Sequence, residues 1–353
     1  MAFTYNWNLS DLENVSKNWY KVFSCFSCGW WSSMWYKMAW YDVIGTCEID
    51  KKMNEVYQKN FDPKFKYEMW IQEMCKLDTF PDELYNLDIL DWSPPCSSFS
   101  IAWNREKDWW YEKKFREWQA EQVLDTLFFD FIELGKKLQP KVIIAENVKW
   151  LLLWEARDYV QRIYKDLNDA WYVVDHFLLD SSTMWVPQRR ERVFFIAVRK
   201  DLKNIIYQKD MFHQWPKIQF EFNEKKIVFW EIYDWLWRDI SEGKLAAWHY
   251  RKDTDTSIAD SKERAGLKAS DYNCVYLYKH KVMPTITWRW HYAMIHYDKP
   301  IHASFMEVLE WWSFPKDYDF NIIDNWYIIG MSVPPIMMYW VAQQVKIQLL
   351  DKT

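Results

Sequence analysis

The sequence predicts an α/β fold, in which helices cover both faces of a mostly parallel β-sheet, together with a second, smaller domain. Short apolar runs alternate with segments whose apolar residues recur at helical spacing, which is the pattern of a parallel sheet flanked by helices. Several runs lead directly into polar segments, and open α/β sheets bind ligands at the carboxyl ends of their strands. The alternation stops near residue 202 and resumes near 284, in a chain of 353 residues that exceeds one average domain.

The apolar runs predict six strands. Each run is short and is bounded by polar residues or by a turn signal. The first four lead into polar or Pro-rich segments, and the last two are expected to pair across the turn at 185–188. The predicted strands are 20–26, 42–49, 87–90, 142–145, 173–179 and 192–198.

Two helices follow from apolar residues at helical spacing. The segment 121–138 is expected to pack on the sheet, and the closing segment 335–350 is expected to lie beside the first strand. The stretch after residue 202 is irregular, polar and aromatic, which predicts a separate domain there. The predicted boundaries are 1–201 for the main domain, 202–283 for the small domain and 284–353 for the return to the main domain.

Charge and cysteine content limit which partners, metals and cellular locations are expected for the protein. A net charge of −5 and a pI of about 5.9 provide no overall basic field for nucleic acid, although a local cleft can be basic on an acidic protein. Cys25 and Cys28 form a C-x-x-C pair with no second pair or nearby His, so we expect no metal site. Neither a signal peptide nor an apolar run of 18 residues is present, so we expect a reduced, cytoplasmic protein without membrane attachment.

Tryptophan stands at many positions where a turn would suit glycine. The chain has 27 Trp and 6 Gly, whereas average usage of ~7% would give about 25 glycines. Glycine suits such places because it takes positive φ freely and lets the backbone approach a ligand closely. The suspect positions include Trp30, Trp31, Trp92, Trp150 and Trp185.

Two hypotheses account for this surplus of tryptophan. A gene whose UGA codons specify glycine, translated with a table in which UGA specifies tryptophan, would show Trp at every UGA-encoded glycine. The Lys-, Ile-, Tyr- and Asn-rich composition fits such an AT-rich gene. The alternative is a natural Trp-rich protein, and UGG codons at the suspect positions would establish it.

Five short motifs occur in a recognisable order. They are VFSCFSCGWWS at 22–32, SPPCSSFS at 93–100, ENV at 146–148, QRRER at 188–192 and GMSVPP at 330–335. In this order they resemble the cofactor loop, the nucleophile loop, two further catalytic signatures and the closing motif of the bacterial and phage DNA (cytosine-5)-methyltransferases. Two glycines of that cofactor loop are Trp30 and Trp31 here, and Met331 stands where Asn is usual.

The resemblance implies a Rossmann-like class I methyltransferase sheet that binds S-adenosyl-L-methionine, with a target-recognition domain at 202–283. It implies methylation of double-stranded DNA, with the target cytosine flipped out of the duplex. A monomeric state, a cognate restriction endonuclease as partner in restriction-modification, and the cytoplasm of a bacterial or phage-infected cell are further expectations.

Cys96 is the candidate nucleophile of this reaction. Cytosine C5 is not electron-rich enough to attack a methyl sulfonium, but addition of a thiolate to C6 makes it so. A lone cysteine is more often a small buried residue, and the surrounding SPPC motif favours the catalytic interpretation here.

Three further residues complete the predicted catalytic set. Glu146 follows an apolar strand and is expected to protonate cytosine N3 as the thiolate attacks. Arg190 and Arg192 alternate along one predicted strand and so should share a face. By resemblance, Arg192 holds the cytosine O2, and Arg190 braces the nucleophile loop or a phosphate. Solvated arginines, and an acid at a helix start, are the structural alternatives.

The cofactor is expected to contact residues of three motifs and the end of the second strand. A carboxylate there, Glu48, is placed to bind ribose hydroxyls, as in other Rossmann-like sheets. The expected cofactor residues are Phe26, Ser27, Gly29, Glu48, Ile49, Pro94, Ser332 and Val333.

Two other functions remain open at the level of sequence. If the tryptophans are literal, the chain is a non-catalytic relative that binds DNA but whose cofactor site is blocked. An RNA cytosine-5 methyltransferase of similar fold is the other alternative, and the long segment 202–283 argues against it.

Overall fold

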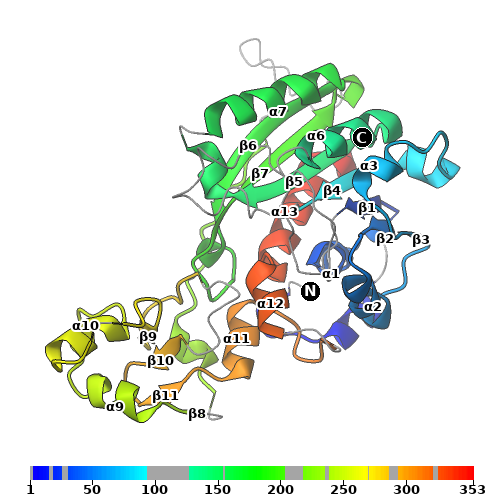
Figure 1. The fold of residues 1–353 in the computed structure, drawn as a ribbon. Coiled ribbons are helices and arrows are strands. Elements are labelled where there is room, and N and C mark those ends of the chain that lie inside the picture. The colour runs from blue at the N-terminus through cyan, green and yellow to red at the C-terminus, as the bar shows by residue number, and fades with distance from the viewer. Residues whose placement is uncertain are drawn as a thin grey trace. The chain divides into compact units, whose positions relative to one another are not determined.

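The computed structural model describes ten stretches of the chain (Figure 1). They are residues 3–15, 19–25, 31–93, 127–153, 156–202, 218–234, 238–268, 270–285, 293–320 and 325–353.

A seven-stranded sheet forms the centre of the fold, with the strand order β3-β2-β1-β4-β5-β7-β6 (Figure 1). The first five strands pair in parallel, and β7 runs antiparallel to β5. This is the predicted mostly parallel sheet. The strands are β1 Lys21–Cys25, β2 Asp42–Cys47, β3 Phe65–Tyr67, β4 Ile89–Trp92, β5 Val142–Val148, β6 Tyr172–Asp180 and β7 Glu191–Arg199.

All six predicted strands are present, and β6 and β7 are neighbours as expected. The strand expected at 87–90 begins two residues later, as β4. β5 continues past the predicted end at Ala145, because its pairing with β7 extends to Val148 after its pairing with β4 has ended. β3 has no counterpart in the sequence analysis, since three half-exposed residues are too few to show a period.

Helices cover both faces of this sheet. Alternate residues of a strand point to opposite faces, and Phe23, Leu90 and Trp92 share one hydrophobic cluster with α6 and α7. On the opposite face, the intervening residue Asp91 bonds to α1. The helices beside the sheet are α1 Trp31–Met38, α2 Lys51–Asn60, α3 Ile71–Met74, α6 Leu127–Leu138, α7 Arg157–Asp169 and α13 Pro335–Gln348.

The two predicted helices correspond to α6 and α13. Residues 121–126 of the first prediction lie outside the described residues. The closing helix lies near the first strand, as predicted: the Tyr41 hydroxyl donates to the carbonyl of Ala342 in α13, and the hydroxyl of Tyr20, next to β1, donates to Asp351.

A second, four-stranded sheet has the order β8-β11-β10-β9. Its core joins Ile240, Trp248, Ile258, Tyr276 and Ile295. The elements of this region are β8 Arg238–Asp239, α9 Glu242–Trp248, α10 Ile258–Arg264, β9 Val275–Leu277, β10 Met294–His296, β11 Ile301–His302, α11 Phe305–Trp311 and α12 Asn325–Met331.

The chain divides into two compact units. The sheet unit comprises Asn14–Leu179, Glu191–Glu221 and Met338–Thr353, and the second unit comprises Met1–Glu13, Asp180–Arg190 and Phe222–Met337. Packing alone does not say which residues read DNA, so the target-recognition assignment of 202–283 stays a prediction.

Three tryptophans have a left-handed backbone. Trp40, Trp171 and Trp185 have φ of 72°, 76° and 59°. Only a few per cent of non-glycine residues have positive φ, and Asn, Asp and His are the usual ones. Half of the six non-glycine residues with positive φ in the described stretches are therefore tryptophans.

Candidate active site

The carboxyl ends of the parallel strands meet at one edge of the sheet. β1 ends at Cys25 and β4 at Trp92, so this edge is where the cofactor and nucleophile motifs begin. The predicted residues Phe26, Ser27, Gly29, Pro94 and Cys96 lie outside the described residues.

Glu146 and Arg192 form a buried ion pair at this end of β5. The Arg192 Nε lies 2.9 Å from the Glu146 Oε1, and the two side chains are 13% and 8% exposed. Glu146 pairs with Phe194 and Val148 pairs with Arg192, so the two charged residues are diagonal neighbours on one face of the antiparallel pair. The Arg192 Nη1 also donates to the Glu191 carbonyl at 2.8 Å, which fixes the guanidinium plane.

Arg190 is placed differently from the prediction. β7 begins at Glu191, so Arg190 precedes the strand and shares no strand face with Arg192. The reason is that the adjoining backbone pairs elsewhere: Arg189 N–H donates to the Met283 carbonyl at 2.9 Å. Arg190 is buried, and its guanidinium lies 5.5 Å from the Trp312 ring centroid.

Glu48 follows β2 directly, as predicted, and is buried and rigidly held. Its Oε1 accepts from the Asp50 N–H at 2.9 Å, and its carbonyl accepts from Asn54 Nδ2 at 2.9 Å. Asp50 in turn caps the first turn of α2. Ile49, between these acids, is half-buried.

Ser332 and Val333 lie just after α12, in the second unit, and both are buried. The Ser332 hydroxyl donates to the Ile329 carbonyl at 2.6 Å, which closes the end of the helix.

The sequence analysis missed Asp91, which is fully buried in β4. Its carboxylate accepts from the hydroxyls of Tyr36 in α1, at 3.0 Å, and Ser24 in β1, at 3.1 Å. Burial raises the pKa of Asp91 to about 7, although the hydrogen bonds from Tyr36 and Ser24 lower it, and the charge of Glu146 raises it further. An acid inside an apolar strand was the available signal.

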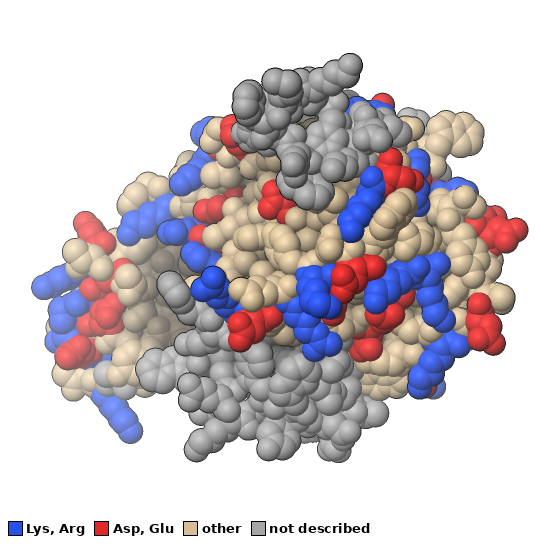
Figure 2. Space-filling view, turned by 90° about the horizontal axis from the view of Figure 1, so that it is seen from above, with Lys and Arg blue, Asp and Glu red and all other residues tan. Residues whose placement is uncertain are grey.

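The surface carries both signs of charge. On the face that Figure 2 shows, Lys and Arg are interspersed with Asp and Glu. None of the helices in the described stretches is long and apolar enough to span a membrane.

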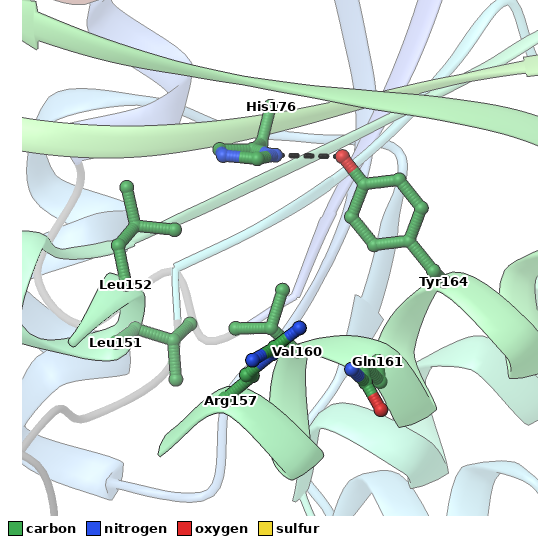
Figure 3. A pocket seen from close by; sticks show the side chains of 7 residues that line it. All are labelled: Leu151, Leu152, Arg157, Val160, Gln161, Tyr164 and His176. Carbon is green, nitrogen blue, oxygen red and sulfur yellow. Dashed lines mark hydrogen bonds between the residues drawn. The ribbon is translucent and has the colours of Figure 1, made fainter. Parts of the chain in front are cut away.

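A cavity of about 630 Å³ lies between the turn after β5, helix α7 and strand β6 (Figure 3). Tyr164 Oη and His176 Nδ1 are hydrogen-bonded at 2.6 Å across it. It contains none of the predicted site residues. Its lining is Leu151, Leu152, Arg157, Val160, Gln161, Tyr164 and His176.

Comparisons with protein families and with known relatives agree with each other. The profile of the family described as C-5 cytosine-specific DNA methylase matches residues 25–347. Type II methyltransferase M.FnuDI of Fusobacterium nucleatum is 25% identical over 94% of this chain and 96% of its own length. Type II methyltransferase M.Sau96I of Staphylococcus aureus is 32% identical over 54% of this chain and 42% of its own length.

Solved structures show the same fold. A protein encoded within an Escherichia coli prophage, described as a DNA modification methyltransferase, superposes with a TM-score of 0.63 at 19% identity, over 94% of this chain and 99% of its own. DNMT2 of Spodoptera frugiperda gives 0.59 at 16% identity, over 92% and 99%. The sheet is therefore that of the class I methyltransferases.

Proposed function

The chain belongs to the C-5 cytosine-specific DNA methylase family, and on this premise we propose that it methylates cytosine C5 through a covalent bond between Cys96 and C6. The enzyme is a DNA cytosine methyltransferase, and the methyl donor of the family is S-adenosyl-L-methionine. The proposed substrate is a cytosine flipped out of double-stranded DNA. The geometry of Glu146 and Arg192 is the single observation that best supports this mechanism.

Cys96 provides the nucleophile in this proposal. Its thiolate adds to C6, and the electrons of the C5–C6 double bond become available at C5. When bound, S-adenosyl-L-methionine would supply the methyl group that C5 takes up, as a methyl sulfonium whose sulfur would keep the bonding electrons. Loss of the C5 proton to water, departure of the thiolate and return of the N3 proton to Glu146 then restore the double bond and the free enzyme.

Glu146 and Arg192 act together on the cytosine ring. In this proposal Glu146 takes up a proton when the flipped base enters, and that proton passes to N3 as the thiolate adds, which removes the negative charge that develops on the ring. The Arg192 Nε faces Glu146 and Nη1 faces a carbonyl, so we assign Nη2 to the cytosine O2. A guanidinium suits this task because its donors form a planar fork.

The residues at the edge of β2 fit the cofactor. A ribose diol donates two hydrogen bonds, and an ionised carboxylate such as that of Glu48, held in place by the Asp50 N–H, is the matching acceptor. We propose that Glu48 and Ile49 hold the nucleoside end. Phe26, Ser27, Gly29, Pro94, Ser332 and Val333 complete the proposed cofactor site.

Arg190 and the DNA-reading segment belong to the same proposal. The burial of Arg190 favours bracing of the nucleophile loop over contact with a phosphate. Segment 202–283 is proposed to recognise the target sequence. Relatives are named both type II and orphan methyltransferases, so a partner endonuclease stays a prediction, as does the monomeric state.

Covalent trapping tests the mechanism. Duplex DNA that carries 5-fluorocytosine cannot lose a C5 proton after methylation, so the Cys96 adduct should persist and survive denaturing electrophoresis. We expect this complex with S-adenosyl-L-methionine and the chain that carries Trp30→Gly and Trp31→Gly, and none when Cys96→Ser is added to that chain. An adduct formed equally by Cys96→Ser would exclude Cys96 as the nucleophile.

A further inference from the structure

Asp91 links three elements of the sheet unit at one buried point. The carboxylate lies in β4, opposite Ser24 in the register of the parallel pair β1–β4. One oxygen accepts from Ser24 Oγ at 3.1 Å and the other from Tyr36 Oη at 3.0 Å. All three side chains are completely buried, so the hydrogen bonds replace water contacts that these groups have lost.

These three elements are the anchors of the two proposed active-site loops. β1 ends one residue after Ser24, where the cofactor motif continues, and α1 begins at Trp31, the next-to-last residue of that motif. β4 ends one residue after Asp91 and leads to the nucleophile motif. A single carboxylate therefore bonds to both anchors of the cofactor loop and belongs to the strand that precedes Cys96.

We propose that Asp91 is a positioning residue, which holds both anchors of the cofactor loop against the strand that leads to the nucleophile. This inference rests on the proposed function. It assigns to Asp91 no contact with the substrate or the cofactor.

The charge of Asp91 makes this link sensitive to pH. The groups around it are Tyr36 from α1, Ser24 and the buried thiol of Cys25 from β1, and Glu146 from β5. With a pKa of about 7, the carboxyl is protonated below neutrality and then accepts hydrogen bonds less strongly. The link should thus hold the cofactor loop best above pH 7, and cofactor affinity should fall as the pH falls below 7.

Calorimetric titration of S-adenosyl-L-methionine between pH 5.5 and 8.5 tests the proposal. The protein is the full chain carrying Trp30→Gly and Trp31→Gly, so that the indoles do not obstruct binding. The dissociation constant should rise below pH 7, by at most about tenfold per pH unit for one linked proton. Asp91→Asn should bind more weakly at pH 8 and show no such dependence.

Tyr36→Phe separates a positioning role from a general loss of stability. The Tyr36 hydrogen bond lowers the pKa of Asp91, so its removal should move the midpoint of the affinity profile to higher pH. Asp88→Asn is the matched control. Asp88 precedes β4 at the opposite end, where it accepts from Lys21 N–H at 2.7 Å and pairs with Lys141 at 2.9 Å. This variant should lose stability and keep the unsubstituted pH profile.

A flat profile in the parent chain with glycine at positions 30 and 31, or an unchanged profile after Asp91→Asn, would overturn the proposal. Neither result would contradict the covalent mechanism. The trapping experiment detects the adduct between Cys96 and DNA, whereas the titration measures the affinity for the cofactor.

An independent observation carries a second inference, about the left-handed tryptophans. After α1, the Tyr41 N–H donates to the Tyr36 carbonyl at 2.8 Å, with Trp40 at φ 72° between them. After α10, the Leu267 N–H donates to the Lys262 carbonyl at 2.9 Å, with Gly266 at φ 69°. Both are the same helix ending, in which the left-handed residue is usually glycine.

We infer that Trp40, Trp171 and Trp185 occupy glycine positions of the functional protein. Trp171 also follows a helix end, after the Ala170 cap of α7, and Trp185 lies in the turn before β7. Trp40 and Trp171 are 37% and 51% exposed, so neither indole is a fully buried core residue. Decoding of UGA as tryptophan in a gene that uses it for glycine accounts for all three.

Melting temperatures test this inference on the protein itself. Trp40→Gly and Trp171→Gly should each raise the midpoint of thermal unfolding by about 2–4 °C. Trp230→Gly is the control, because Trp230 is 52% exposed but is not among the residues with positive φ. It should lower the midpoint or leave it unchanged. An equal rise in all three variants, or UGG codons at positions 40, 171 and 185, would refute the inference.

Discussion

Glu146 and Arg192 face each other as diagonal neighbours on β5 and β7, and their side chains form an ion pair of 2.9 Å. The pair is nearly excluded from water, so neither charge is well solvated without the other. At the carboxyl end of β5, the pair brings together the Glu146 carboxyl, which is proposed to donate a proton, and the Arg192 guanidinium, which donates hydrogen bonds in one plane. A cytosine ring presents the matching groups, N3 and O2, on adjacent atoms.

Removal of Arg192 should therefore affect both stability and catalysis. Arg192→Ala removes the cation that lies 2.9 Å from the buried carboxylate of Glu146, and we expect the free energy of unfolding to fall by about 3–5 kcal/mol. Arg192→Lys retains the charge without the fork, and should recover part of the stability but little of the methyl transfer. Urea unfolding and methyl-transfer rates measure the two effects. Full activity of Arg192→Lys would contradict the assignment of Nη2 to cytosine O2.

Glu146→Gln should remove the proton donor while retaining the size of the side chain. We expect methyl transfer to fall by about 10²–10⁴-fold, the usual contribution of general acid catalysis. The affinity for S-adenosyl-L-methionine should stay within about twofold, since Glu146 is assigned to the base and not to the cofactor. Single-turnover rates and cofactor titration provide the comparison. A rate within threefold, roughly, of the unsubstituted enzyme would remove Glu146 from the acid role.

In the protein with glycine restored, Cys96→Ser should abolish methyl transfer and leave cofactor binding nearly intact. A serine hydroxyl is a much weaker nucleophile than a thiolate at neutral pH, whereas the two side chains have similar size. Transfer of labelled methyl groups to DNA measures the first effect, and calorimetry measures the second. Loss of cofactor binding together with activity would mean that the substitution disturbs the loop, and methylation at the unsubstituted rate would dismiss Cys96 altogether.

Trp30→Gly and Trp31→Gly together should strengthen binding of S-adenosyl-L-methionine. Overpacking of a tight site typically costs about 1–3 kcal/mol per residue, and more where positive φ is required. If the two energies add, affinity should improve by several orders of magnitude. Calorimetric titration of both chains, purified side by side, is the measurement. Equal affinities would show that this loop tolerates two indoles.

Gly45→Ala should destabilise the sheet. A Cβ on Gly45 in β2 would lie 2.7 Å from two ring carbons of Phe23 and 3.0 Å from the Phe65 Cβ. The core would have to shift to make room, and we expect the free energy of unfolding to fall by about 1–3 kcal/mol. Gly243→Ala is the matched control. A Cβ there meets no atom within 4 Å, and alanine favours helix α9 by up to about 1 kcal/mol. In urea unfolding, the free energy of unfolding should fall in Gly45→Ala and rise in Gly243→Ala. A change of the same sign in both variants would contradict the packing described at β2.

Much of the fold and part of the site follow from the sequence by itself. The strands around Val22, Val43 and Ile143 are visible because a buried parallel strand needs a continuous apolar run, which is a local property. The order of the motifs can also be read directly from the sequence. So can the positions of Glu48 and Glu146 after such apolar runs, because these too are local properties. The surplus of tryptophan is visible in the sequence, but only the backbone shows a left-handed conformation at Trp40, Trp171 and Trp185, whereas the suspect Trp92 lies buried in β4.

Other features depend on segments that are distant in the chain. The proposed role of Asp91 depends on its hydrogen bonds from a tyrosine in α1 and a serine in β1. No local sequence pattern specifies which hydroxyls contact a buried carboxylate. Arg190 looks equivalent to Arg192 in sequence, but the preceding backbone pairs with Met283 instead of extending β7. The register between β5 and β7 is what joins Arg192 to Glu146. Local patterns determine which elements form, whereas strand pairing and packing decide which side chains meet, because those contacts are made only when the whole sheet assembles.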